Sequence, residues 1–152
     1  MENNKYDSTE DTNKHIQLVQ EYMDLCIFWL NNMAYNHDRT KLEEPEKEYF
    51  DTYTPLLKDV TYGSDKYKEY LKEIKVALDH HYKHNSHHTE HYEQGIKGMG
   101  LLNLLEMICD WIAATKRHND GDILKSIEIN QERFGYTDEL KQIFINTVEK
   151  IV

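Results

Sequence analysis

The sequence has few helix breakers and few thiols, with two prolines, six glycines and two cysteines in 152 residues. It contains no apolar run of about 18 residues, so no transmembrane helix is expected. Its first residues, MENNKYDSTEDTNK, lack the basic start and apolar stretch of a signal peptide. Cys26 and Cys109 each lie in an apolar helical pattern and are expected to be reduced and buried. We therefore expect a cytoplasmic protein with no membrane partner.

Positive charge is scarce as well. The chain has 18 lysines and arginines against 28 aspartates and glutamates, a formal net charge of −10. Binding to duplex nucleic acid or to an anionic membrane needs basic surface, so neither partner is expected. A small phosphorylated ligand is not excluded, because a bound dication can invert the local field.

Strand patterns are absent, and helical periodicity takes their place. Apolar residues recur at three- and four-residue steps through most of the chain, and no segment alternates with period two over a strand's length. The length suits one domain with a single core. We predict an all-α fold, a single compact bundle of five to seven helices over residues 12–152, after a flexible N-terminus at 1–11. The longest core helices are predicted at 12–33 and 101–117.

Prolines and caps suggest where two shorter helices begin and end. Pro45 is compatible with the first turn of a helix that ends at about Tyr53. Pro55 is expected to interrupt the chain after it. Ser64 or Asp65 is predicted to cap the next helix.

The pair His37-Asp38 offers nitrogen and oxygen ligands side by side. Neighbouring residues on a helix point about 100° apart, but a cation between them can be reached by both side chains. A hard or borderline divalent metal accepts this pairing. Asp110 lies in the most hydrophobic predicted helix, where a charge is costly unless it binds a metal or is paired. The alternatives for Asp110 are a solvated position or a Lys or Arg partner. His15 is the only histidine before His37.

A second source of ligands is the stretch HHYKHNSHHTEH at residues 80–91, which holds six of the nine histidines. His81 continues an apolar stripe and is expected to point inward, towards His37-Asp38. If Asn85-Ser86 breaks the helix, His81 and the pair His87-His88 can converge from two elements. If the helix continues, His81, His84 and His88 share one face. The alternative for the whole tract is a polar surface run, and His80, His84 and His91 are expected to be solvated or to lie behind the ligands.

The ordered set His15, His37-Asp38 and Asp110 resembles the HD-domain superfamily of metal-dependent phosphohydrolases, whose pattern is His…His-Asp…Asp. The run His37-Asp38-Arg39-Thr40-Lys41 is similar to the His-Asp-x-x-Lys of several branches. The resemblance covers about residues 12–118, and the chain is also similar to short, uncharacterised bacterial and phage proteins. It implies an HD-type helical bundle that holds a divalent metal through His15, His37, Asp38 and Asp110.

Some HD branches hold a second metal through two further histidines. Here only the 80–91 tract can supply them, and His81, His87 and His88 are the expected ligands. In those branches the histidines are spread more widely, so the resemblance leaves one or two ions open, with Mn, Fe, Co, Zn and Mg as candidates. Asp38 would bridge two metals.

The implied activity is hydrolysis of a nucleotide or another small phosphate ester by a metal-activated water. Lys41 could reach a phosphate oxygen. Glu106 could orient or deprotonate the water, or it could be a surface carboxylate. Two alternatives stay open: a di-iron HD-type oxygenase, and a non-catalytic module that binds a nucleotide, a metal or another protein. A homo-oligomer is compatible with either.

Overall fold

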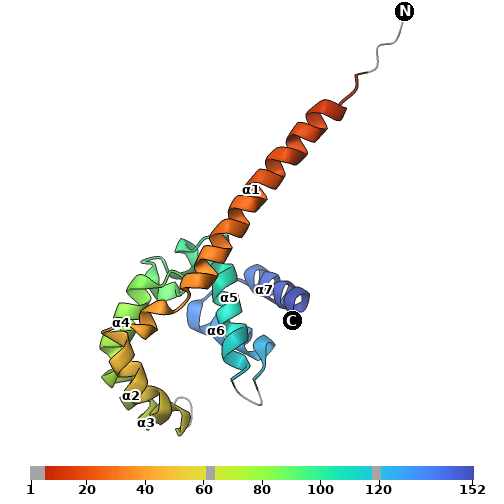
Figure 1. The fold of residues 1–152 in the computed structure, drawn as a ribbon. Coiled ribbons are helices and arrows are strands. Elements are labelled where there is room, and N and C mark those ends of the chain that lie inside the picture. Colours follow the sequence, from red (N-terminus) through yellow and green to blue (C-terminus); the bar gives the residue numbers. More distant parts are fainter. Residues whose placement is uncertain (1–5, 61–63, 118–120) are drawn as a thin grey trace, which may run out of the picture. The chain divides into compact units, whose positions relative to one another are not determined.

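The computed structural model describes residues 6–60, 64–117 and 121–152. In these ranges the chain forms seven α-helices and three short 3-10 helices (η), and no strand, so the all-α prediction is confirmed (Figure 1). Part of the predicted flexible N-terminus, residues 1–5, lies outside the described residues. The elements are α1 (Thr9–Asn36), η1 (Arg39–Leu42), α2 (Glu46–Lys58), α3 (Asp65–Glu73), α4 (Lys75–His84), η2 (Thr89–His91), η3 (Gly95–Gly98), α5 (Leu101–Thr115), α6 (Ile123–Phe134) and α7 (Asp138–Ile151).

The chain divides into two compact units, Met1–Tyr35 and Asn36–Val152. The first unit is essentially α1, which begins at Thr9 instead of residue 12. Asp7 explains the earlier start, because its Oδ1 accepts the Thr9 N–H at 3.0 Å and the Thr9 hydroxyl at 2.6 Å. The α1 helix has 28 residues and none of them is buried within this unit. The core role of 12–33 stays a prediction.

The apolar core of the second unit lies among α5, α6 and α7. Its α5 helix keeps the predicted core role, although it ends at Thr115 instead of 117. Gly135 turns the chain from α6 towards α7 with φ at 65°, a left-handed conformation that glycine adopts without a steric cost. The buried cluster consists of Met107, Ile108, Ile127, Tyr136, Phe144 and Val148.

The α2 helix packs against α4 and runs five residues beyond its predicted end (Figure 1). Pro55 lies inside it and does not interrupt it. Proline lacks an N–H, so the carbonyl of Asp51, four residues earlier, loses its helical partner. Asp51 is exposed, and water can satisfy that carbonyl.

The predicted helix that leads into the histidine tract is divided at Ile74 into α3 and α4. Ser64 caps α3 as predicted, since its Oγ accepts the Tyr67 N–H at 3.2 Å. The α4 helix ends at His84, and Asn85 is extended with φ −120° and ψ 103°. Of the two alternatives at Asn85-Ser86, the structure shows the break, and His81 and His87 belong to different elements.

The two cysteines correct a sequence prediction. Cys26 and Cys109 are free thiols, and both are exposed rather than buried. On α5 the buried residues are Met107 and Ile108, whereas Cys109, the next residue, is exposed. Over the three described ranges, no helix combines the length and the apolar character needed to cross a membrane.

Candidate metal centre

Asp38 occupies an unusual backbone position in the turn before η1. Its φ and ψ are 57° and 13°, the left-handed region that few non-glycine residues adopt. Such a conformation persists where surrounding contacts hold the residue, and it is concentrated at functional sites. One such contact is Lys41, whose Nζ donates to Asp38 Oδ2 at 2.6 Å.

Three imidazoles present their Nε2 atoms to the Asp38 carboxylate. His81 Nε2 and His87 Nε2 lie 3.2 and 3.4 Å from Asp38 Oδ1, and His37 Nε2 lies 3.7 Å from Oδ2. His88 Nε2 is 2.9 Å from His81 Nε2. One ligand atom from each of Asp38, His81, His87 and His88 falls within 4.8 Å of the others, close enough for one cation to be shared.

Two further groups overlap with this one. His37, Asp38 and Asp110 also offer atoms within 4.8 Å of one another, as do His37, His87 and Glu106. Asp38 therefore belongs to two of the three groups. A carboxylate in this position can serve two neighbouring cations, because it has two oxygens with separate neighbours.

Two atoms at the centre lack a hydrogen-bond partner within the described part of the chain. They are Asp38 Oδ1 and His87 Nε2, and both are buried. Although these atoms are close, they are not aligned for a hydrogen bond to each other. A buried polar atom without a partner costs about 1–3 kcal/mol. Although burial lowers the pKa of His87, its contacts with Asp38 and Glu106 raise it overall, so a cation bound at Nε2 would displace a proton. A cation that both atoms bind would remove the cost of the unpaired atoms, and the donor set of imidazole and carboxylate fits a divalent metal.

The pKa values of Asp38 and His88 at the centre are both lowered, with opposite consequences for their charge. Although burial raises the pKa of Asp38, the nearby His81, His87 and Lys41 lower it well below its usual range. Burial, with the neighbouring His87 and His81 rings, lowers the pKa of His88 to about 3. Asp38 is therefore ionised and His88 neutral at neutral pH. These are the protonation states in which carboxylates and imidazoles bind metals.

His37 has the opposite shift. Its contacts with Asp110 and Glu106 raise its pKa to about 10 and outweigh its burial. Glu106 Oε1 lies 3.0 Å from His37 Nδ1 and 3.3 Å from His87 Nδ1. Although burial raises the pKa of Glu106, His37 and His87 lower it to about 2. A carboxylate held in this way orients imidazoles, and its predicted role towards a water stays a prediction.

The remaining predicted residues have different surroundings. Asp110 Oδ1 lies 3.7 Å from His37 Nε2, so this carboxylate does join the histidines. Lys41 is partly exposed, and its Nζ lies 5.5 Å from the centre of the Phe50 ring. His15 is exposed on α1, in the other unit, and its assignment as a ligand stays a prediction.

Sequence reasoning missed Glu46, which is fully buried against the tract. Its Oε1 and Oε2 lie 2.8 Å from Nδ1 of His80 and of His81. The surrounding sequence, EEPEKEYF, is typical of a solvated helix start. One signal could have found it, since Glu46 is four residues before Phe50 and shares its face, and Phe50 packs edge-on against His81. The expectation that His84 and His91 are solvated agrees with their exposure.

Comparison with known proteins places the chain in a family. A family model described as a family of unknown function (DUF5662) matches residues 4–152. The chain belongs to DUF5662. No curated protein and no solved structure matches it. Membership of DUF5662 assigns no activity, so the function must be argued from the site.

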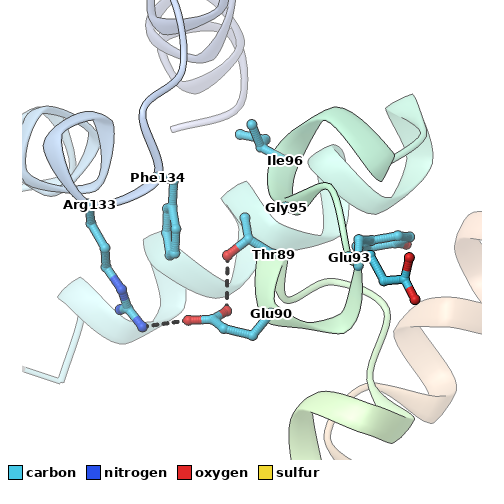
Figure 2. A pocket seen from close by; sticks show the side chains of 8 residues that line it. Thr89, Glu90, Glu93, Gly95, Ile96, Arg133 and Phe134 are labelled. Carbon is cyan, nitrogen blue, oxygen red and sulfur yellow. Dashed lines mark hydrogen bonds and ion pairs between the residues drawn. The ribbon is translucent and has the colours of Figure 1, made fainter.

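A separate open hollow of about 410 Å³ lies beside η2 in this DUF5662 chain. Figure 2 shows Arg133 and Phe134 of α6 on one side of it, with Thr89 and Glu90 on the other. Glu90 accepts a hydrogen bond from Arg133 at 2.7 Å and one from Thr89 Oγ1 at 2.9 Å. The ion pair between Arg133 and Glu90 therefore joins the segment after His88 to α6.

Proposed function

We propose that this DUF5662 protein is a metal-dependent phosphohydrolase that acts on a nucleotide or another small phosphate ester. The observation that carries the proposal is the shared Asp38 carboxylate, whose buried Oδ1 faces the buried, unpaired Nε2 of His87. The resemblance of the His37-Asp38 run to HD-domain phosphohydrolases supports hydrolysis over other uses of such a centre.

Two ligand sets are available. Asp38, His81, His87 and His88 would hold one divalent ion, and His37, Asp38 and Asp110 would contribute to a second. Mixed imidazole and carboxylate ligands suit Zn, Fe, Co or Mn better than Ca. An ion held by these residues would supply the charge that lowers the pKa of a water and neutralises a phosphate.

The chain's own residues define the rest of the site. Glu106 holds the rings of His37 and His87, and Lys41 keeps a partly exposed ammonium next to Asp38. An ammonium there can contact a phosphate oxygen at the edge of the centre. The net charge of −10 disfavours a long polyanion, so a small ester is the proposed substrate.

A di-iron oxygenase is the second candidate, and the number of histidines near Asp38 favours it. Iron takes imidazole and carboxylate ligands readily. The third candidate is a module that binds a metal or a nucleotide without catalysis. The identity of the metal in the native protein separates the first two, and its absence favours a non-catalytic role.

The test combines elemental analysis with activity. The native protein is analysed for metals and then assayed on a panel of nucleotides and simple phosphate monoesters with Mn²⁺, Co²⁺, Zn²⁺, Mg²⁺ and anaerobic Fe²⁺. Asp38→Asn is compared with Asp51→Asn, whose carboxylate is exposed on α2. We expect hydrolysis by wild type and Asp51→Asn only. Metal binding without hydrolysis of any ester would contradict the proposal.

A further inference from the structure

Glu46 is a charged side chain with no contact with solvent, at the first position of α2. A buried carboxylate is tolerated only when its lone pairs are satisfied. Its two oxygens satisfy this with separate rings of α4, Oε1 with His80 Nδ1 and Oε2 with His81 Nδ1, both at 2.8 Å. The Glu46 carboxylate therefore contacts two consecutive histidines, one with each oxygen.

Thr40 and Asn85 surround the contact between Glu46 and His81, with Asn85 Nδ2 3.1 Å and Thr40 Oγ1 3.3 Å from His81 Nδ1. Asn85 Nδ2 donates to Thr40 Oγ1 at 2.8 Å and to the His81 carbonyl at 2.8 Å. The Thr40 hydroxyl in turn donates to Glu46 Oε2 at 3.0 Å. Asn85 is buried, so this chain of donors is shielded from water. Glu46 is an acceptor at every contact.

This arrangement favours one tautomer of His81, whose ring lies between two carboxylates. Glu46 Oε2 is hydrogen-bonded to Nδ1 at 2.8 Å, whereas Asp38 Oδ1 is 3.2 Å from Nε2 and makes no hydrogen bond. In the neutral ring the hydrogen is therefore favoured on Nδ1, and Nε2 keeps its lone pair. That Nε2 faces Asp38 Oδ1 at 3.2 Å and His88 Nε2 at 2.9 Å. The nitrogen that points at the candidate metal position is thus the one able to bind a cation.

The same device occurs a second time in the unit. Glu106 Oε1 lies beside Nδ1 of His37 and Nδ1 of His87, and both rings present Nε2 to Asp38. Two carboxylates from different helices therefore each hold a pair of imidazoles by Nδ1. The repetition shows that the Nδ1 sides of the rings face Glu46 or Glu106, while the Nε2 atoms of His37, His81 and His87 face Asp38.

We propose that Glu46 is a positioning residue that holds His81 in the Nδ1–H tautomer and so raises the affinity of the Asp38–His81–His87–His88 group for a divalent cation. The affinity part of this inference rests on the proposed metal centre, and the tautomer part does not. Carboxylates that hold a metal-binding imidazole in this way commonly change metal affinity by about 10- to 100-fold.

The test uses Glu46→Gln, which keeps the volume but replaces one acceptor oxygen by a donor. Glu48→Gln, an exposed neighbour on α2, is the matched control. Long-range ¹H–¹⁵N spectra of the metal-free protein report which nitrogen of His81 carries the hydrogen. We expect Nδ1–H in wild type and Glu48→Gln, and Nε2–H to appear in Glu46→Gln. Calorimetric titration with Zn²⁺ should show about 10- to 100-fold weaker binding for Glu46→Gln alone.

Glu46→Asp keeps the argument testable if Glu46→Gln does not fold, as judged by circular dichroism. It retains the carboxylate but withdraws it by one methylene, so an intermediate loss of Zn²⁺ affinity is expected. Zn²⁺ binding by wild type that the Glu46 variants retain, with an unchanged His81 tautomer, would overturn the inference. Failure of the proposed metal centre looks different, because wild type itself would then bind no Zn²⁺.

Discussion

Asp38 Oδ1 lies 3.4 Å from His87 Nε2, and both atoms are buried without a hydrogen-bond partner in the described ranges. A buried polar atom that lacks a hydrogen-bond partner carries an energetic cost, and here two such atoms are adjacent. The left-handed backbone of Asp38 adds a conformational cost at the same residue. A ligand that binds both atoms would offset these two costs. A cation is a suitable ligand, because a carboxylate oxygen and an imidazole nitrogen both bind cations.

Asp38→Asn should remove the response of the protein to added metal. Asparagine tolerates the left-handed backbone, so the fold is expected to persist while the ligand charge is lost. At a metal concentration 100 times Kd, wild type should gain about 2.7 kcal/mol, a rise in Tm of about 5–10 °C. Differential scanning fluorimetry with and without Mn²⁺ or Zn²⁺ measures the shift. An equal shift in Asp38→Asn would show that Asp38 is no ligand, and Asp51→Asn is the control.

Asp110→Asn should abolish activity at only a small cost in stability. The apolar sequence around Asp110 predicts an uncompensated charge in the metal-free protein, so removing it would be stabilising or neutral. The structure instead places Asp110 Oδ1 3.7 Å from His37 Nε2 and keeps it partly exposed. Loss of this ion pair should cost up to about 1 kcal/mol. Chemical denaturation in EDTA tests this, and a stabilised variant would mean that the pairing with His37 is absent in solution.

The sequence predicts the helices and the convergence of the histidines because both follow from periodicity. His81 is next in a stripe that faces inward, and Asn85-Ser86 carries the stop signal that separates it from His87. Periodicity does not predict the turn at Asp38. There a left-handed backbone conformation directs the carboxylate towards His81 and His87. The prediction that Pro55 interrupts the chain is wrong for a related reason, because the cost of proline inside a helix depends on whether the carbonyl of Asp51 can reach water.

Glu46 shows the limit of sequence reasoning for the site. Its neighbours are charged, and a glutamate at a helix start is ordinarily solvated and favoured by the helix dipole. Its burial arises from α4 packing on α2, a contact that joins residues 34 and 35 positions apart. The sequence contains only one sign of this long-range contact, namely that Glu46 and Phe50 share one face of α2.

The metal-free protein should be most stable near pH 6.5. The pKa of His88, lowered to about 3 chiefly by burial, lets the unfolded chain bind a proton that the folded chain does not. Stability is therefore lost as the pH falls from about 6.5 towards 3. The pKa of His37, raised to about 10 by Asp110 and Glu106, has the opposite effect. Its contribution is fully present below about pH 6.5 and is lost as the pH rises towards 10.

Urea denaturation in EDTA between pH 4.5 and 9 measures both limbs of this profile. His88→Gln should flatten the acid limb and His37→Gln the alkaline limb, each relative to wild type. Other carboxylates also titrate on the acid side, so the difference between variant and wild type is the quantity to compare. An acid limb that His88→Gln leaves unchanged would mean that His88 accepts a proton in the folded state.

Lys41→Met and Arg133→Met should differ sharply in their effects on hydrolysis. Lys41 Nζ lies 2.6 Å from Asp38 Oδ2 and is partly exposed, so its loss removes a positive charge from the edge of the proposed phosphate site. We expect a fall in kcat/KM on the order of 100-fold. Arg133 is paired with Glu90, is about half exposed (52%) and belongs to none of the three groups that could hold a metal. Its loss should change kcat/KM little and cost less than about 1 kcal/mol in stability. A large fall in kcat/KM for Arg133→Met, with Lys41→Met near wild type, would move the phosphate site to the hollow beside η2.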